Sequence, residues 1–378
     1  MKEPDANDQH IVNIVDWLLQ YAFEQRASDI HIEPRRDVGN VRFRIDGVLY
    51  SVYELPQQVA SAVTSRIKIL GRMDVAEKRR PQDGRLKTRS PEGAEVELRL
   101  ATLPTAFGEK LVMRIFDPEV LQKSFGELGL ADKDLLSWQG MTDSGNGIVL
   151  VTGPTGSGKT TTLYSTLRKL ATPEVNVCTI EDPIEMIEGA FNQMQVNHGI
   201  DLDFSSGVRA LMRQDPDIIM VGEIRDLETA NMAVQAALTG HLVISTLHTN
   251  DSPSSISRLL ELGVPAYLIK ATVRGVMSQR LVRILCPDCK VSSERVASPV
   301  GCKACRETGY LGRQGIYEVL VNSRNVQEKI SSHMDTAAVR DVAMREGMRT
   351  LRLSGAARVA RGETTIEEVM RVAPMLDA

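Results

Sequence analysis

Hydrophobic residues recur at helical spacing over Ile11–Phe23, and the segments that follow alternate between hydrophobic and polar residues, as half-buried strands do. A second helical pattern covers Pro56–Leu70. The expected strands are Asp29–Glu33, a hairpin of Val41–Ile45 and Val48–Tyr50 with an Asp-Gly turn, Glu95–Ala101, and Lys110–Phe116. The pattern predicts a small α+β domain over residues 8–118.

The pattern changes after a predicted linker at residues 119–129, which contains Gly126 and Gly129 and has no sustained period. From there strands and helices alternate, which is typical of a parallel α/β sheet. The expected strands are Ile148–Thr152, Asn176–Glu181, Ile218–Val221 and His241–Leu247, and the intervening helices include Lys159–Leu170, Gly207–Arg213 and Glu228–Thr239. We therefore predict an α/β domain over residues 130–283.

The region after Cys305 is predicted to be mostly helical, which makes residues 311–378 a helical C-terminal region. A last helix is expected after Thr365, which can cap it together with Glu368 three residues on. The other expected helices cover Asn325–Ser332, Thr336–Glu346 and Leu351–Arg361.

Composition narrows the class of protein. The chain has 378 residues, enough for two or three domains, and its net charge of −4 gives no general case for nucleic-acid or membrane-surface binding. No apolar run approaches the roughly 18 residues of a membrane span, and the first residues lack the core of a signal peptide. We expect a cytoplasmic protein whose membrane role, if it has one, comes through a partner.

One stretch carries a recognisable chemistry. Its spacing of Gly153, Gly158, Lys159 and Thr160 fits the phosphate-binding loop G-x-x-x-x-G-K-[ST] between an apolar strand and a helix. Glycines let backbone N–H groups converge on phosphate oxygens, the lysine reaches the β- and γ-phosphates, and the threonine hydroxyl binds Mg²⁺. The alternative is a chance glycine turn. The predicted nucleotide-binding residues are Gly153, Pro154, Thr155, Gly156, Ser157, Gly158, Lys159, Thr160 and Thr161.

Acidic residues follow two of the predicted strands. The apolar segment after Asp215 ends in Glu223, the expected form of a Walker B strand, and a second strand ends in Glu181, Asp182 and Glu185. Since parallel strands meet the ligand at their carboxyl ends, both clusters should approach the phosphate loop, as should His248. A carboxylate there can support the metal shell or activate water. For Asp182, a role as a helix cap is as good an interpretation as a role in the active site.

Four of the five cysteines form a C-x₂-C…C-x₂-C arrangement of Cys286, Cys289, Cys302 and Cys305, which defines a subdomain over residues 284–310. Four thiolates at this spacing can hold a structural Zn²⁺ with no open position for catalysis. Two disulfides, or an iron–sulfur cluster, are the alternatives.

In their order along the chain these motifs resemble the secretion ATPase superfamily, specifically the type II secretion and type IV pilus assembly ATPases. The segments that carry the resemblance are Arg79–Arg85, Gly108–Lys110, the phosphate loop, Glu181–Glu185, Gly222–Asp226 and Leu247–Asn250. It implies a RecA-like ATPase core and a PAS-like N-terminal domain. It further implies that Glu185 activates water, that Glu223 and His248 belong to the Walker B segment and the histidine box, and that Arg99 and Arg114 reach the γ-phosphate.

The resemblance also implies a homo-hexamer that uses ATP and Mg²⁺ and works with platform and recruitment proteins at the inner membrane. A tetracysteine in this family marks assembly rather than retraction ATPases. Full-length members usually carry a further N-terminal docking domain, whereas this chain starts almost directly with the helix Ile11–Phe23.

Two other functions fit a phosphate loop. A nucleic-acid-translocating motor is one, but the charge balance and the lack of an aromatic stacking platform disfavour it. A non-catalytic, nucleotide-gated scaffold is the other, and the presence of Lys159, Thr160, Glu185 and Glu223 disfavours that one.

Overall fold

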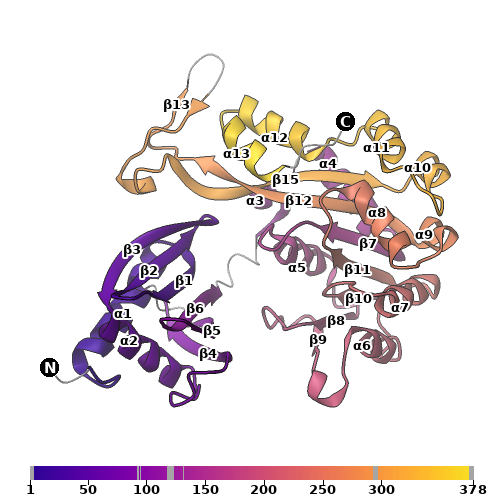
Figure 1. Cartoon of the computed structure of the whole chain (residues 1–378). Coiled ribbons are helices and arrows are strands. Elements are labelled where there is room, and N and C mark those ends of the chain that lie inside the picture. Colours follow the sequence, from indigo (N-terminus) through magenta and orange to yellow (C-terminus); the bar gives the residue numbers. More distant parts are fainter. Residues whose placement is uncertain are drawn as a thin grey trace. The chain divides into compact units, whose positions relative to one another are not determined.

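The computed structural model describes residues 4–91, 93, 95–116, 123–130, 132–292 and 297–373. The chain forms two compact units, Met1–Pro118 and Glu119–Ala378 (Figure 1). Residues 119–122 of the predicted linker lie outside the described residues. We describe each unit by itself.

The N-terminal unit is an antiparallel sheet with two helices. Its helices are α1 (Gln9–Glu24) and α2 (Gln57–Leu70). Its strands are β1 (Ala27–Pro34), β2 (Val38–Ile45), β3 (Val48–Pro56), β4 (Gln82–Arg89), β5 (Glu95–Thr105) and β6 (Gly108–Phe116), paired in the order β3-β2-β1-β6-β5-β4. All were expected except β4, an edge strand in which Leu86 alone is buried, so that it shows little hydrophobic alternation.

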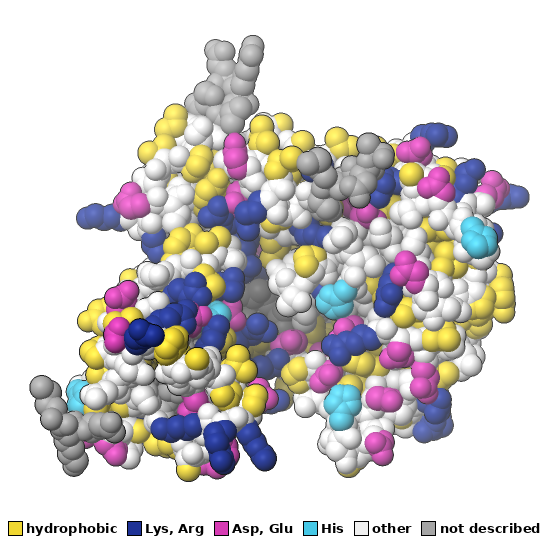
Figure 2. All heavy atoms as spheres, in the orientation of Figure 1, with side chains coloured by type: hydrophobic (Ala, Val, Ile, Leu, Met, Phe, Trp, Pro, Cys, Tyr) yellow, Lys and Arg dark blue, Asp and Glu magenta, His cyan; other side chains and the backbone are white. Residues whose placement is uncertain are grey.

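Both faces of β1 are buried, which corrects the expected half-buried strand. Ile30 and Ile32 pack in one core with the apolar residues of α1 and α2. On the other face Asp29, His31 and Glu33 are only 6%, 9% and 2% exposed, because basic side chains from neighbouring strands lie over them. Figure 2 shows Lys and Arg side chains in dark blue on the visible surface of this unit.

The C-terminal unit contains a seven-stranded, largely parallel sheet, which confirms the predicted α/β class. Its strands are β7 (Gly147–Thr152), β8 (Val177–Glu181), β9 (Asn192–Gln195), β10 (Ile218–Val221), β11 (Leu242–Leu247), β12 (Val273–Leu285) and β15 (Tyr310–Val321). They pair in the order β15-β12-β7-β11-β10-β8-β9, and only the β12–β15 pair is antiparallel (Figure 1).

Helices cover both faces of this sheet. They are α3 (Phe125–Leu128), α4 (Asp132–Thr142), α5 (Lys159–Leu170), α6 (Phe204–Leu211), α7 (Leu227–Leu238), α8 (Ser252–Glu261) and α9 (Ala266–Thr272). Cys178 and Ile180 of β8 face the main core, where α6 to α9 pack. Glu181 of the same strand faces the opposite side and contacts Tyr164 of α5. Helix α5 therefore covers the second face.

The predicted helical C-terminal region begins with a strand, β15, and becomes helical only after it. Its helices are α10 (Arg324–Lys329), α11 (Thr336–Arg345), α12 (Leu351–Ala360) and α13 (Ile366–Val372). Thr365 caps α13 by accepting the N–H of Glu368, but the Glu368 carboxylate binds Arg283 and Arg371 instead of closing a capping box. Burial by itself raises the pKa of Glu368, and the two arginines outweigh this and lower it to about 2.

The described part of the unit also contains two short paired strands, β13 (Val291–Ser292) and β14 (Ala297–Ser298), and two 3₁₀ turns, at His198–Ile200 and Lys303–Cys305. Within the described residues, no helix combines the length and the hydrophobicity needed to cross a bilayer.

Candidate active site

The phosphate loop joins the carboxyl end of β7 to the first residue of α5. Gly153, Gly156 and Gly158 have φ angles of 149°, 77° and 88°, which residues with a side chain adopt only under strain. Gly158 is the N-cap of α5 and offers no side chain to the first amides of the helix. These amides and the helix dipole form an anion site. Inside the loop, the buried Ser157 hydroxyl has no hydrogen-bond partner among the described residues.

The Lys159 ammonium lies within the loop. Its Nζ donates hydrogen bonds to the carbonyl oxygens of Gly153, at 2.8 Å, and Pro154, at 3.1 Å. Burial lowers the pKa of Lys159 to about 8, against the opposing effect of the Glu223 carboxylate. A bound phosphate would offer this ammonium a stronger, charged acceptor than two carbonyls.

Glu223 and His248, which the sequence placed at the ligand side of the sheet, are neighbours. The His248 Nε2 lies 3.4 Å from a carboxylate oxygen of Glu223, whose other oxygen accepts from Arg225. Burial and the charge of Lys159 lower the pKa of His248, which favours the neutral ring. The two residues line an open groove of about 770 Å³ together with Arg225, Asn250 and Arg258.

Strand β12 contacts the first turn of α5 and the segment after β11 through two residues that its local sequence does not single out. Gln279 accepts the hydroxyl of Thr162 at 2.7 Å, and Arg280 donates to the carbonyl of Asn250 at 2.7 Å. Arg280 is 4% exposed, although arginine is a residue type usually found at the surface. Nothing in the local sequence links these residues to the phosphate loop, because β12 lies more than one hundred positions further along the chain.

The two glutamates of the acidic strand end have different environments. Glu181 is 4% exposed and accepts hydrogen bonds from Thr179, Tyr164 and Gln193. Glu185 lies in the following irregular loop and is partly exposed. Glu181 is therefore a buried residue whose carboxylate binds neighbouring side chains, whereas the Glu185 side chain is partly open to solvent.

Arg99 and Arg114 belong to the N-terminal unit, on β5 and β6, where they are directly opposite each other. Arg99 is in turn opposite Arg85 of β4, so the three arginines form one row across the sheet. Arg114 donates from Nε to Asp29 at 3.0 Å, and the Arg99 guanidinium lies 5.8 Å from the centre of the Phe116 ring. Their role at the γ-phosphate stays a prediction.

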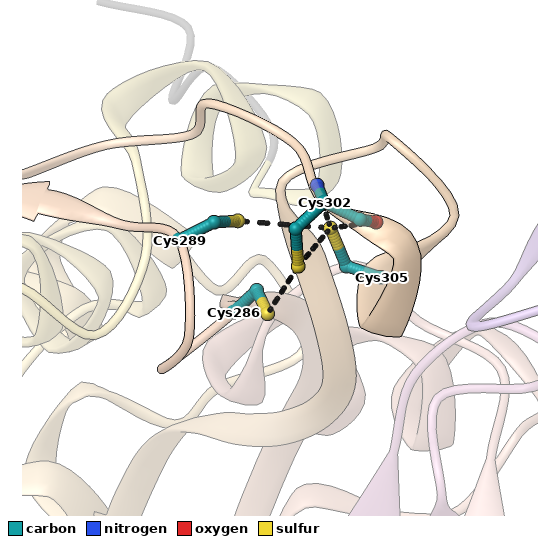
Figure 3. A group of neighbouring side chains, drawn as sticks. All are labelled: Cys286, Cys289, Cys302 and Cys305. Carbon is teal, nitrogen blue, oxygen red and sulfur yellow. Dashed lines mark hydrogen bonds between the residues drawn. The ribbon is translucent and has the colours of Figure 1, made fainter.

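The four cysteines converge into a cluster (Figure 3). Their Sγ atoms lie within 4.8 Å of one another, and the closest pairs are 3.7 to 3.9 Å apart. Ligands of a tetrahedral zinc at about 2.3 Å are separated by about 3.8 Å, so the cluster fits one such ion. No disulfide joins these four cysteines in the structure. Backbone N–H groups of Cys302 and Gly309 donate to the Cys305 sulfur, as suits a thiolate.

A family model described as "Type II/IV secretion system protein" matches residues 4–371. The chain belongs to this family. The resemblance drawn from its motifs is thus confirmed.

Relatives of this secretion-family protein come from both pilus and secretion machines. The type IV pilus assembly ATPase TfpB of Acinetobacter baylyi is 61% identical over 393 residues, covering 99% of this chain and 67% of TfpB. The type II secretion system protein HxcR of Pseudomonas aeruginosa is 45% identical over 362 residues, covering 96% and 77%. The crystal structure of the pilus retraction motor PilT with bound ADP has a TM-score of 0.68 and 27% identity, covering 96% of this chain and 97% of PilT.

Proposed function

We propose that this protein hydrolyses ATP to power protein secretion through a type II secretion system or the assembly of a type IV pilus or pseudopilus. The observation that carries the proposal is the Lys159 ammonium inside a glycine loop, at the sheet edge where Glu223 and His248 meet. Membership of the family and the names of the relatives support the same activity.

In this proposal the loop amides and Lys159 hold the β- and γ-phosphates. Thr160 and Glu223 would hold Mg²⁺, which would neutralise part of the phosphate charge. Glu185 accepts a proton from the attacking water. His248, whose Nε2 lies 3.4 Å from the Glu223 carboxylate, would help to orient that carboxylate.

The N-terminal unit would be the PAS-like domain of a two-domain subunit with a RecA-like core, in a homo-hexamer. Arg99 and Arg114 would contact the γ-phosphate when the units close on ATP, so that phosphate chemistry drives a displacement. Their position opposite each other on adjacent strands supports a joint role, because it places both side chains on the same face of the sheet.

The cysteine cluster would hold a structural zinc ion through Cys286, Cys289, Cys302 and Cys305. Following the family pattern, we propose an assembly rather than a retraction motor. Its partners would be platform and recruitment proteins of the inner membrane, with the protein on the cytoplasmic side and no direct membrane or nucleic-acid contact.

The test is steady-state phosphate release with the variants Lys159→Ala and Glu185→Gln. Loss of a general base lowers turnover by about 10²-fold or more, so Glu185→Gln should bind ATP and barely hydrolyse it. Glu174→Gln, an exposed glutamate away from the loop, is the matched control. Normal hydrolysis by Glu185→Gln would reject the base assignment, and strong stimulation of turnover by DNA or RNA would favour a nucleic-acid motor instead.

A further inference from the structure

The loop that carries Glu185 has little regular structure of its own, and side chains from other elements hold its backbone. The carbonyl oxygen of Met186 accepts from the side-chain amide of Gln193 at 2.9 Å and lies 3.1 Å from the hydroxyl oxygen of Tyr164. The N–H of Glu188 donates to the side-chain oxygen of Gln193 at 2.7 Å. One side-chain amide therefore binds a backbone acceptor and a backbone donor one and three residues after Glu185.

The position of the Gln193 side-chain amide follows from the alternation of side chains along β9. In the parallel register, Gln193 lies beside Thr179 and Gln195 beside Glu181, so their side chains share one face of the sheet. Met194 faces the other side and packs on the main core. Gln195 adds a third contact with the loop by accepting the N–H of Ile184 at 3.3 Å.

The buried Glu181 carboxylate sets the orientation of the Gln193 amide. One of its oxygens accepts from the Gln193 nitrogen at 3.1 Å, and the other accepts from the Tyr164 hydroxyl at 2.7 Å. Burial and the charge of Glu181 both raise the pKa of Tyr164, so the phenol stays a donor. With its nitrogen directed at the carboxylate, Gln193 must turn its oxygen toward Glu188.

The same network reaches the phosphate loop. Tyr164 is on α5, four residues after Thr160 and thus about one turn along the helix that starts in that loop. The network therefore connects the helix that would receive the phosphates with the loop that carries Glu185.

We propose that Gln193 is a positioning residue for ATP hydrolysis: it holds the backbone on which Glu185 is presented to the attacking water. The inference rests on the proposed function, in which Glu185 is the base. Gln193 itself touches no substrate. Its contribution is geometric, and a shift of about 1 Å in a reacting group costs on the order of 10²-fold in rate.

The experiment compares Gln193→Met with Asn192→Ala in the full chain. Methionine has a similar length but neither donates nor accepts a strong hydrogen bond. Asn192 is an exposed neighbour on the same strand, and its amide binds Asn176 away from the loop. We expect Gln193→Met to lower kcat by about 10- to 100-fold, with KM for ATP and ADP affinity within about twofold. Asn192→Ala should match the wild type, and an unchanged kcat in Gln193→Met would overturn the proposal.

A double-variant cycle separates positioning from general destabilisation. If Gln193 acts through Glu185, then Gln193→Met should cause no further loss in a Glu185→Gln background. A further loss of equal size would assign Gln193 a structural role and overturn the proposal. Tyr164→Phe deletes one hydroxyl from the same network and gives a milder test, with a smaller fall in kcat expected and an unchanged kcat counting against the proposal. Normal hydrolysis by Glu185→Gln alone would instead reject the proposed base.

Discussion

Replacing Lys68 with methionine should strongly destabilise the N-terminal unit. Lys68 is fully buried at the end of α2, where its Nζ donates to the Glu109 carboxylate at 2.7 Å and to the Glu77 carbonyl at 2.8 Å. The Glu109 side chain is 7% exposed, so water cannot replace the lost partner. Removing one partner of such a pair costs about 3–5 kcal/mol, because it leaves a buried charge without compensation.

The cost comes from the charge that is left on the buried Glu109 carboxylate, so replacing that carboxylate with a neutral amide should relieve it. The double variant Lys68→Met/Glu109→Gln should recover most of the loss.

The assay is urea unfolding followed by tryptophan fluorescence. Each unit has one tryptophan, Trp17 in the first and the buried Trp138 in the second, so a Trp138→Phe background reports on the N-terminal unit. Lys87→Met is the matched control, since Lys87 pairs with Glu95 at the same 2.7 Å but on the surface, and its effect should lie within experimental error. Equal losses for the two variants, or a Lys68→Met deficit that the double variant does not reduce, would refute the reasoning.

Two further predictions concern the C-terminal unit. Because the pKa of Glu368 is lowered to about 2, its contribution is present above the value of an unfolded glutamate, about 4.3, and is lost as pH falls toward 2. Glu368→Gln should lower the free energy of unfolding by about 3 kcal/mol at pH 7 and by about half as much at pH 3, with Trp138 fluorescence as the readout and the exposed Glu367→Gln showing no effect. Elemental analysis should find about one zinc ion per chain, reduced in Cys302→Ser and unchanged in Cys178→Ala, and equal zinc in both would contradict the metal site.

Local motifs made part of the fold and site predictable. The phosphate loop and its helix, Lys159–Leu170, depend on consecutive residues, and the helix has the expected bounds. Strand β12 escaped prediction because Arg274, Arg280 and Arg283 interrupt its hydrophobic pattern, and their partners are supplied by residues far along the chain. A charged residue in a strand indicates a surface until its partner is known.

The different burial of Glu181 and Glu185 also depends on residues far along the chain and could not be predicted. Both glutamates belong to the same motif, and from the sequence either carboxylate could face a ligand. The pairing of β9 beside β8 decides between them, because it brings Gln193 against Glu181 and buries that carboxylate. The pairing of two strands depends on contacts between distant parts of the chain, so the spacing of residues within the motif cannot predict it.

The glycines of the phosphate loop are favoured by the packing of the loop as well as by its chemistry. A Cβ atom at Gly153 would lie 2.6 Å from the Gln279 carbonyl oxygen, and one at Gly158 would lie 2.7 Å from the Gln279 side-chain nitrogen. The contact at Gly153 is with backbone and is too short for any carbon atom, so the loop could not pack against β12 with a larger residue there. The contact at Gly158 is with the end of a flexible side chain, which would have to move. Strand β12 thus requires a glycine at Gly153 whether or not a phosphate is bound. The close approach gives the loop a rigid backing, which keeps its amides converged before a ligand arrives and reduces the ordering cost of binding.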